Sequence, residues 1–168
     1  MKIVSDAECY NWMKASRGTE FTWHGVREEY AHRTTYRLPV DTGKKTALAR
    51  HLVAELNTAL PGILWITGWG IFSSSENMAL FDGYRRSIGE YRALYDAPGH
   101  IFTESDRVHI ECIVDLAMYF YWDASLFDAG GIWIETSHDE FFSISAMDRR
   151  RLTEIDDRLS PLELTHHS

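Results

Sequence analysis

Apolar residues recur at helical spacing along much of the chain. A Ser or Thr followed three positions later by an acidic residue, the pattern of a capping box, precedes such stretches at 5–8, 73–76 and 103–106. Leucines four positions apart predict another helix that ends before Pro61, and amphipathic spacing predicts one near the C-terminus. The predicted helices cover residues 5–15, 42–60, 73–92, 107–117 and 152–159.

Alternation of polar and apolar residues predicts strands between and after these helices. Residues 30–38 alternate in this way and are rich in aromatic and β-branched side chains. The short apolar run 63–66 lies between Pro and Gly residues, which is typical of a buried strand. From about Tyr121 the pattern becomes that of strands again, so we expect a sheet whose last members are close together in sequence.

The strands after Tyr121 predict a meander. The adjacent Gly130 and Gly131 are suited to the positive φ angles of a tight hairpin, and a polar turn at 137–140 leads to a third strand at 141–145. Helices and strands follow no repeated βαβ order, which favours an α+β fold. We therefore expect one two-layer domain over residues 1–168, with about five helices and an antiparallel sheet that ends in a three-stranded meander.

Charge is unevenly distributed over a chain with a formal net charge of −8. Residues 1–103 hold 12 Lys or Arg and 11 Asp or Glu, whereas residues 104–168 hold 5 and 14. A long acidic surface repels phosphate backbones, so no nucleic-acid partner is expected. A basic protein partner fits this charge, and so does an acidic face that serves only solubility.

The cysteines and the first residues indicate a compartment. Cys9 and Cys112 lie far apart in helical patterns, which predicts reduced, buried thiols and no disulfide. The N-terminus turns polar too early for a signal peptide, and the longest apolar run is too short to span a bilayer. We expect a cytoplasmic protein without a membrane segment or a cofactor, either as a monomer or as a homodimer.

No complete catalytic motif occurs in the sequence. The segment 43–46 lacks the spacing of a phosphate loop, and His109 with Glu111 lacks the cysteines of a zinc deaminase site. Residues at element ends and in loops, including a loop expected at 98–100, remain as candidates. A core position for Trp69 and a plain polar turn at 138–140 explain the same pattern. The candidate binding residues are Trp69, Glu76, His100, Trp122, Asp123, His138, Asp139 and Glu140.

The segments that contain these candidates also carry a resemblance. They are similar to an uncharacterised family of bacterial proteins over roughly residues 65–142, in a pattern that has Trp at position 72 and Gly at position 121. This chain has Phe72 and Tyr121 there. The resemblance implies a bacterial cytosolic protein and brings no known activity. It rests on residues 69–73 with 76–77, 98–102, 122–124 and 137–140.

Two functional hypotheses arise from the sequence. The first is a small acidic binding protein that masks or escorts a basic protein partner, as immunity and antitoxin proteins do, with 22 aromatic residues available as interface anchors. The alternative is a metal-dependent enzyme or metal-binding protein that uses His138, Asp139, Glu140 and Asp123. Such N and O ligands suit Zn, Mn or Fe, but their spacing matches no established ligand motif.

One contact within the meander is predicted from the turn. If Gly130 and Gly131 form a two-residue loop, Asp123 lies directly opposite His138 on one side of the sheet. A three-residue loop would shift the partner by one, and a helix beginning at Ser137 would abolish the pair. In the paired arrangement the carboxylate raises the pKa of His138.

Overall fold

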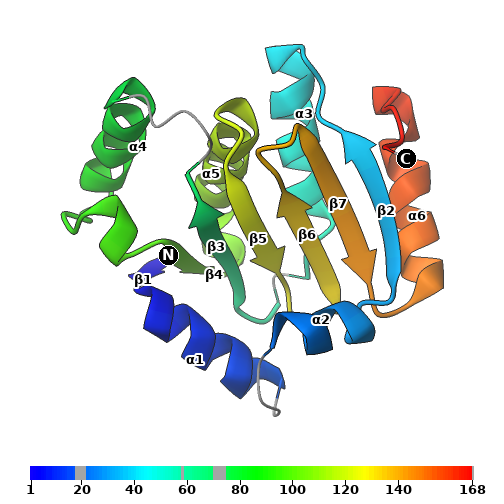
Figure 1. Ribbon diagram of the computed structural model, residues 1–168, viewed down its shortest axis with the longest axis horizontal. Coiled ribbons are helices and arrows are strands. Elements are labelled where there is room, and N and C mark those ends of the chain that lie inside the picture. Colours follow the sequence, from blue (N-terminus) through cyan, green and yellow to red (C-terminus); the bar gives the residue numbers. More distant parts are fainter. Residues whose placement is uncertain (18–21, 58, 70–74, 168) are drawn as a thin grey trace.

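An antiparallel sheet forms the centre of the molecule (Figure 1). The computed structural model describes residues 1–17, 22–57, 59–69 and 75–167. Within these residues the strands lie in the order β1-β4-β3-β5-β6-β7-β2, so the expected α+β fold and its closing meander β5-β6-β7 are confirmed. The strands are β1 (Lys2–Val4), β2 (His32–Arg37), β3 (Gly62–Gly68), β4 (Gly99–Phe102), β5 (Asp123–Phe127), β6 (Ile132–Thr136) and β7 (Phe141–Ala146).

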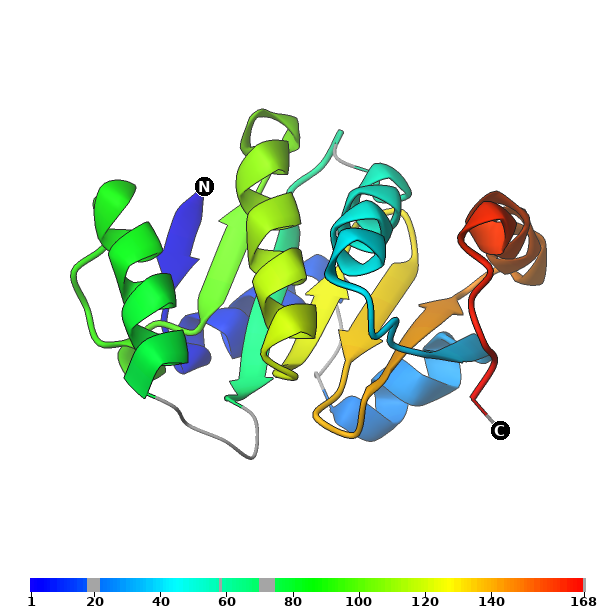
Figure 2. The same ribbon diagram turned by 90° about the horizontal axis from the view of Figure 1, so that it is seen from above.

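Helices lie on both faces of the sheet. Four of them, α3 to α6, form the main helical layer on one face, and α1 and α2 lie against the other (Figure 2). No helix among the described residues is both long and apolar enough to cross a membrane. The α-helices are α1 (Asp6–Arg17), α2 (Trp23–Glu29), α3 (Thr42–Ala54), α4 (Ser75–Ser87), α5 (Arg107–Tyr119) and α6 (Arg149–Leu159).

The described caps agree with the predicted helix starts. Ser5 and Glu8 form the expected capping box, with the Ser5 backbone N–H donating to the Glu8 carboxylate at 2.8 Å. Thr103 and Asp106 form the second, and the Asp41 side chain caps α3 by accepting from the Lys44 N–H. The box expected at 73–76 lies outside the described residues.

Helix α2 is the one described α-helix that the sequence patterns did not predict. It has seven residues, too few to show a helical period, and only Val26 in it is buried. Its N-cap Thr22 accepts a hydrogen bond from the Gly25 N–H. Together with α1 it adds a partial third layer to the two that were expected.

The hydrophobic core is divided by the sheet into two clusters. The larger one lies between the sheet and the main helical layer and includes Leu48, Phe102, Ile113 and Phe142. The smaller one lies between the sheet and α1 and α2. The smaller cluster consists of Val4, Cys9, Met13, Val26, Tyr30, Ile63, Trp65, Phe127 and Trp133.

The hairpin between β5 and β6 has a three-residue loop, so the expected two-residue loop is wrong. The Asp128 N–H donates to the Ile132 carbonyl, and Gly131 has a φ of 86°. The physical reason is the buried Asp128 carboxylate, which accepts from the Gly130 and Ile132 N–H groups at 2.9 and 2.8 Å. Ala124 therefore pairs with Thr136, one position from the expected register.

The segment around His100 is a strand and not the expected loop. In β4, His100 pairs with Leu64 of β3 and with Ile3 of β1. Its neighbour Gly99 lies so close to α1 that an added Cβ would stand 2.0 Å from the Cys9 Sγ. The four residues from Gly99 to Phe102, which follow Pro98, are too few to show the alternation of a strand, and this explains the wrong prediction.

Helix α5 ends with a left-handed residue at Tyr121. The Trp122 N–H donates to the Ala117 carbonyl at 2.8 Å, as in a Schellman cap, and Tyr121 has a φ of 54°. Glycine adopts this conformation without strain, which suits the glycine at position 121 in the resembling pattern. Here the tyrosine ring lies 4.1 Å from the ammonium nitrogen of the buried Lys45.

The cysteines are both free, and only one is buried. Burial and the nearby carboxylates of Asp6 and Glu8 raise the pKa of Cys9 to about 12. Cys112 lies on the exposed side of α5, so its expected burial is wrong, because the apolar residues Ile110 and Ile113 turn the other side of this helix inward.

The edge strand β2 carries a short backbone pairing on its outer side. The Arg37 N–H donates to the Thr165 carbonyl at 2.8 Å, and the His167 N–H donates to the Thr35 carbonyl at 2.9 Å. Tyr36 and His166 form the bridge between these two bonds. Residues near the C-terminus thus extend the sheet beyond β2.

Candidate functional site

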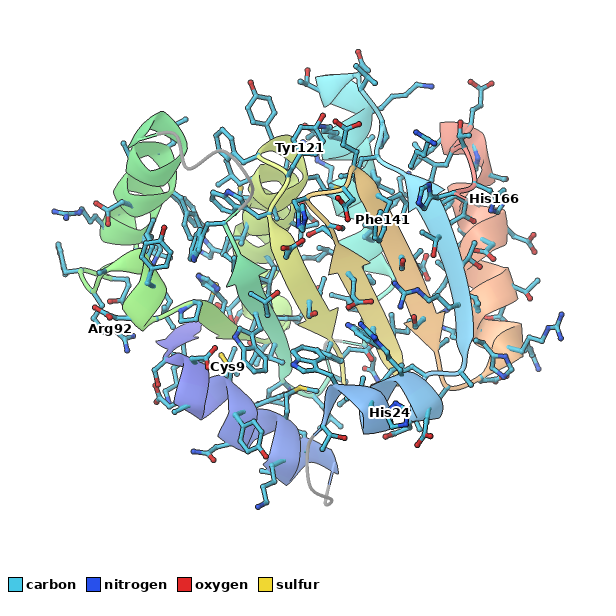
Figure 3. All side chains as sticks on the ribbon, in the orientation of Figure 1. Cys9, His24, Arg92, Tyr121, Phe141 and His166 are labelled. Atoms are coloured by element: carbon cyan, nitrogen blue, oxygen red, sulfur yellow. The ribbon has the colours of Figure 1, made fainter. Side chains whose placement is uncertain are left out.

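One part of the sheet face opposite the main helical layer has no described helix over it. Helix α2 covers the end where Phe127 and Trp133 lie. The ring centre of Tyr30, which follows α2, is 6.3 Å from that of Phe127 and 6.0 Å from that of Trp133. Farther along β5, β6 and β7, Figure 1 shows no helix in front of the strands. Figure 3 places Phe141 on this part of the face, with His24 at the opposite, covered end.

Small hydroxyl side chains form the floor of this uncovered part. Ser125 pairs with Glu135 across β5 and β6, and Ser143 pairs with Glu135 across β6 and β7. Because small serines flank the longer Glu135, the surface has a cavity here with a volume of about 280 Å³. We call this cavity the polar hollow. It is lined by Arg27, Arg33, Thr67, Asp123, Ala124, Ser125, Glu135, Thr136, Ser137 and Phe141.

Glu135 and Arg33 are held together in the polar hollow. An Arg33 guanidinium nitrogen lies 3.0 Å from the Glu135 carboxylate and donates to the Ser143 hydroxyl at 2.7 Å. Thr35 and Ser143 share a further hydrogen bond of 3.0 Å. Burial raises the pKa of Glu135, and the positive charge of Arg33 opposes this rise. The carboxylate is thus partly desolvated and fixed in place.

Asp123 and His138 form a second pair at the rim of the polar hollow. The His138 Nδ1 lies 2.9 Å from each Asp123 carboxylate oxygen, and the His138 backbone N–H donates to the same carboxylate at 2.9 Å. The hydrogen bond with Asp123 raises the pKa of His138, as predicted. Gly68 lies opposite, where an added Cβ would be 2.4 Å from the carboxylate.

The pair forms although the register that predicted it is shifted by one. Strand β6 ends at Thr136, and the turn after it brings the His138 backbone and ring over the end of β5. The Ser137 N–H donates to the Phe141 carbonyl at 2.9 Å, so the turn belongs to a hairpin and no helix begins at Ser137. The contact therefore depends on the turn and not on direct cross-strand pairing.

The two acidic residues after His138 are exposed in the turn. The His138 Nε2 lies 3.6 Å from an Asp139 oxygen, and Glu140 has a φ of 65°. Among the described residues, no group of three or more His, Cys, Asp or Glu side chains is arranged to hold a metal ion. The metal-dependent alternative thus has no supporting geometry in this part of the chain.

Two of the remaining candidates lie in the core. Trp122 and His100 are both fully buried on the helical side of the sheet, so we leave them out of the candidate site. Burial, with the nearby charge of Arg85, lowers the pKa of His100 to about 3. The ring centres of Trp69 and Trp122 are 5.0 Å apart, and the side chain of Glu76 lies outside the described residues.

A second cavity adjoins the polar hollow at Thr67. It has about 680 Å³ and lies where β3 continues past the first residue of β4. Aromatic rings dominate its walls, and we call it the aromatic hollow. It is lined by Asp6, Tyr10, Thr22, Trp23, Trp65, Ile66, Thr67, Trp69, Tyr95 and Pro98.

Sequence reasoning missed the centre of the polar hollow. Ser125, Glu135 and Ser143 each have a core residue as a direct neighbour in their strands, namely Leu126, Ile134 and Ile144. Polar residues at every second position of a strand indicate a face that is not packed in the core. That signal was present, but the contact of Arg33 with Ser143 joins residues 110 positions apart and has no local signature.

Comparisons with protein-family models, curated proteins and solved structures find no match to this chain. The resemblance of its loop segments to a bacterial family therefore stays a prediction. The two hollows and their charged groups are thus the basis on which a function is assigned.

Proposed function

We propose that this protein binds a basic segment of a protein partner on the uncovered part of its sheet. The observation that carries the proposal is that the two hollows share Thr67, one having half-buried carboxylates and the other aromatic walls. Aromatic side chains are frequent anchors of protein interfaces, and complementary charges add specificity for the partner. Masking or escorting such a partner, in the manner of immunity or antitoxin proteins, is the corresponding role.

Charge on this face supports a basic partner. Among the residues that line the two hollows and the adjoining turn, only Arg27 and Arg33 carry guanidinium groups. Carboxylates are more numerous and attract lysine and arginine side chains. They are Asp6, Asp123, Glu135, Asp139 and Glu140.

The general acidity of residues 104–168 supports the proposal less than the sequence suggested. Asp128 caps its own hairpin, and Asp106 is held by the N-terminal ammonium group of Met1. Asp115 accepts a hydrogen bond from Thr46 at 3.1 Å. Because these carboxylates serve the fold, the carboxylates of the hollows are the ones assigned to the partner.

Fluorescence anisotropy with labelled oligoarginine and oligoglutamate peptides tests the proposal. We expect the wild-type protein to bind oligoarginine, to ignore oligoglutamate, and to lose affinity as salt rises. In the double variant Asp123→Asn with Glu135→Gln the affinity for oligoarginine should fall by about tenfold or more, because two carboxylates of the face become neutral.

A charge-matched control separates the site from net charge. The double variant Asp157→Asn with Glu154→Gln removes the same two charges from α6, in the helical layer on the other side of the sheet. It should bind oligoarginine within about twofold of wild type. Equal weakening in both double variants, or no binding by the wild type, contradicts the proposal.

The remaining expectations belong to this proposal. A cytoplasmic location agrees with the two free thiols of Cys9 and Cys112. A homodimer and the absence of a nucleic-acid partner stay predictions.

A further inference from the structure

Two pairs of aromatic rings contribute to the walls of the aromatic hollow. The ring centres of Trp23 and Trp65 are 5.5 Å apart, with the planes tilted by 34°. The ring centres of Trp69 and Tyr95, which also line the hollow, are 5.5 Å apart in an edge-on arrangement. Thr67 and Pro98 are among the other lining residues. Aromatic faces in a hollow accommodate the methylene groups of a long side chain.

A single carboxylate gives this hollow its charge. Asp6 is the only charged residue among the described residues that line it. Its Oδ1 accepts a hydrogen bond of 2.9 Å from the Trp65 Nε1, which fixes the carboxylate beside the aromatic ring. Asp6 is exposed at the first position of α1, so the carboxylate is accessible from solvent. Aromatic faces and one carboxylate together favour a cation.

We infer that the aromatic hollow binds one arginine side chain of the basic partner. This inference rests on the proposed function and names the group that enters the cavity. The planar guanidinium stacks on indole rings and donates two parallel hydrogen bonds to a carboxylate, which an ammonium group does not do. The neighbouring polar hollow has carboxylates but no indole ring among its described lining residues, and its own Arg27 and Arg33 already supply guanidinium groups there.

The test uses single amino-acid derivatives as probes. Nα-acetyl-arginine amide, the lysine analogue and the uncharged citrulline analogue are titrated into the full chain while the indole N–H signals of the tryptophans are followed by NMR. We expect arginine to shift the signals of Trp23, Trp65 and Trp69. The lysine analogue should bind at least about threefold more weakly than the arginine derivative. The citrulline analogue should bind weakest because it lacks the charge.

Matched variants locate the binding. Asp6→Asn keeps an oxygen that can accept from Trp65 and should weaken arginine binding about fivefold, whereas Asp82→Asn on α4 should not change it. Tyr95→Ala removes an exposed aromatic wall, and Tyr91→Ala removes a similarly exposed ring outside the lining. Equal affinities in all four variants, or no preference for arginine over citrulline, overturn the inference.

The inference and the proposed function fail in different ways. If oligoarginine binding depends on Asp123 and Glu135 but is unchanged by Asp6→Asn and Tyr95→Ala, the proposed function stands and the arginine receptor is wrong. If the arginine derivative binds in the aromatic hollow while no basic peptide binds, the receptor stands and the partner class is wrong.

Discussion

The two faces of the same sheet are built on different chemistry. On the helical side, β7 contributes Phe142, Ile144 and Ala146, all fully buried. On the other side the same strand contributes Ser143 and Ser145, which lie beneath longer polar and aromatic neighbours. Because one face is packed by four helices, the opposite face keeps a hydroxyl floor and charged groups without loss of the fold.

The largest expected effect separates two adjacent residues of β7. Phe142→Ala removes a fully buried ring that stacks on Tyr36 at 5.3 Å and should lower the free energy of unfolding by about 3–5 kcal/mol. Phe141→Ala alters the lining of the polar hollow and should cost less than about 1 kcal/mol. Urea unfolding measures both. Equal losses would mean that the uncovered face is as tightly packed as the covered one.

A smaller effect is expected at Gly68. Its replacement by Ala places a Cβ 2.4 Å from an Asp123 oxygen and should destabilise the fold by about 1–3 kcal/mol while separating Asp123 from His138. The control is Gly83→Ala in α4, where an added Cβ meets nothing within 4 Å. That variant should stabilise the protein by about 0.5–1 kcal/mol, because Ala favours helix. Thermal unfolding of both variants gives the comparison.

The smallest effect is a pH dependence of the uncovered face. Because Asp123 raises the pKa of His138 in the folded state, the stabilisation is fully present below the unfolded value and is lost as pH rises through the folded value. Asp123→Asn should lower the pKa of His138 in an NMR titration, whereas Asp157→Asn should leave it unchanged. Identical titration of His138 in wild type and Asp123→Asn would show that the pair is absent in solution.

Glu135 adds to this pH dependence with the same sign. Its pKa is raised by burial, so the folded state binds its proton more tightly than the unfolded state, and stability falls as pH rises between the two values. The free energy of unfolding of the Glu135→Gln variant, measured across acidic pH, should lack the fall with pH that Glu135 contributes.

Local patterns were enough to predict most elements and one contact of the site. Capping boxes and helical spacing located most of the helices because these signals need only a few consecutive residues. The contact of Asp123 with His138 was predicted from the loop between β5 and β6, which is one residue longer than expected, and it forms through the short turn that follows β6. Such features depend on neighbours in sequence.

The missed features depend on distant parts of the chain. The four residues of β4 are recognisable only between β1 and β3, and the three of β1 only beside β4. Helix α2 is held by the Trp133 side of the sheet. The pairing of β2 with β7 brings Arg33 to Ser143 and so completes the polar hollow. No periodicity in a single segment specifies which strands become neighbours.

The backbone pairing on the outer side of β2 has a consequence for self-association. An edge strand with open N–H and C=O groups invites edge-to-edge aggregation with other chains. Here Thr165 and His167 form hydrogen bonds with the outward Arg37 N–H and Thr35 carbonyl groups of β2. The opposite edge is the short β1, where the Arg92 guanidinium donates to the Ile3 carbonyl at 2.7 Å. Both borders of the sheet are thereby partly blocked, which disfavours edge-to-edge pairing between the sheets of two molecules.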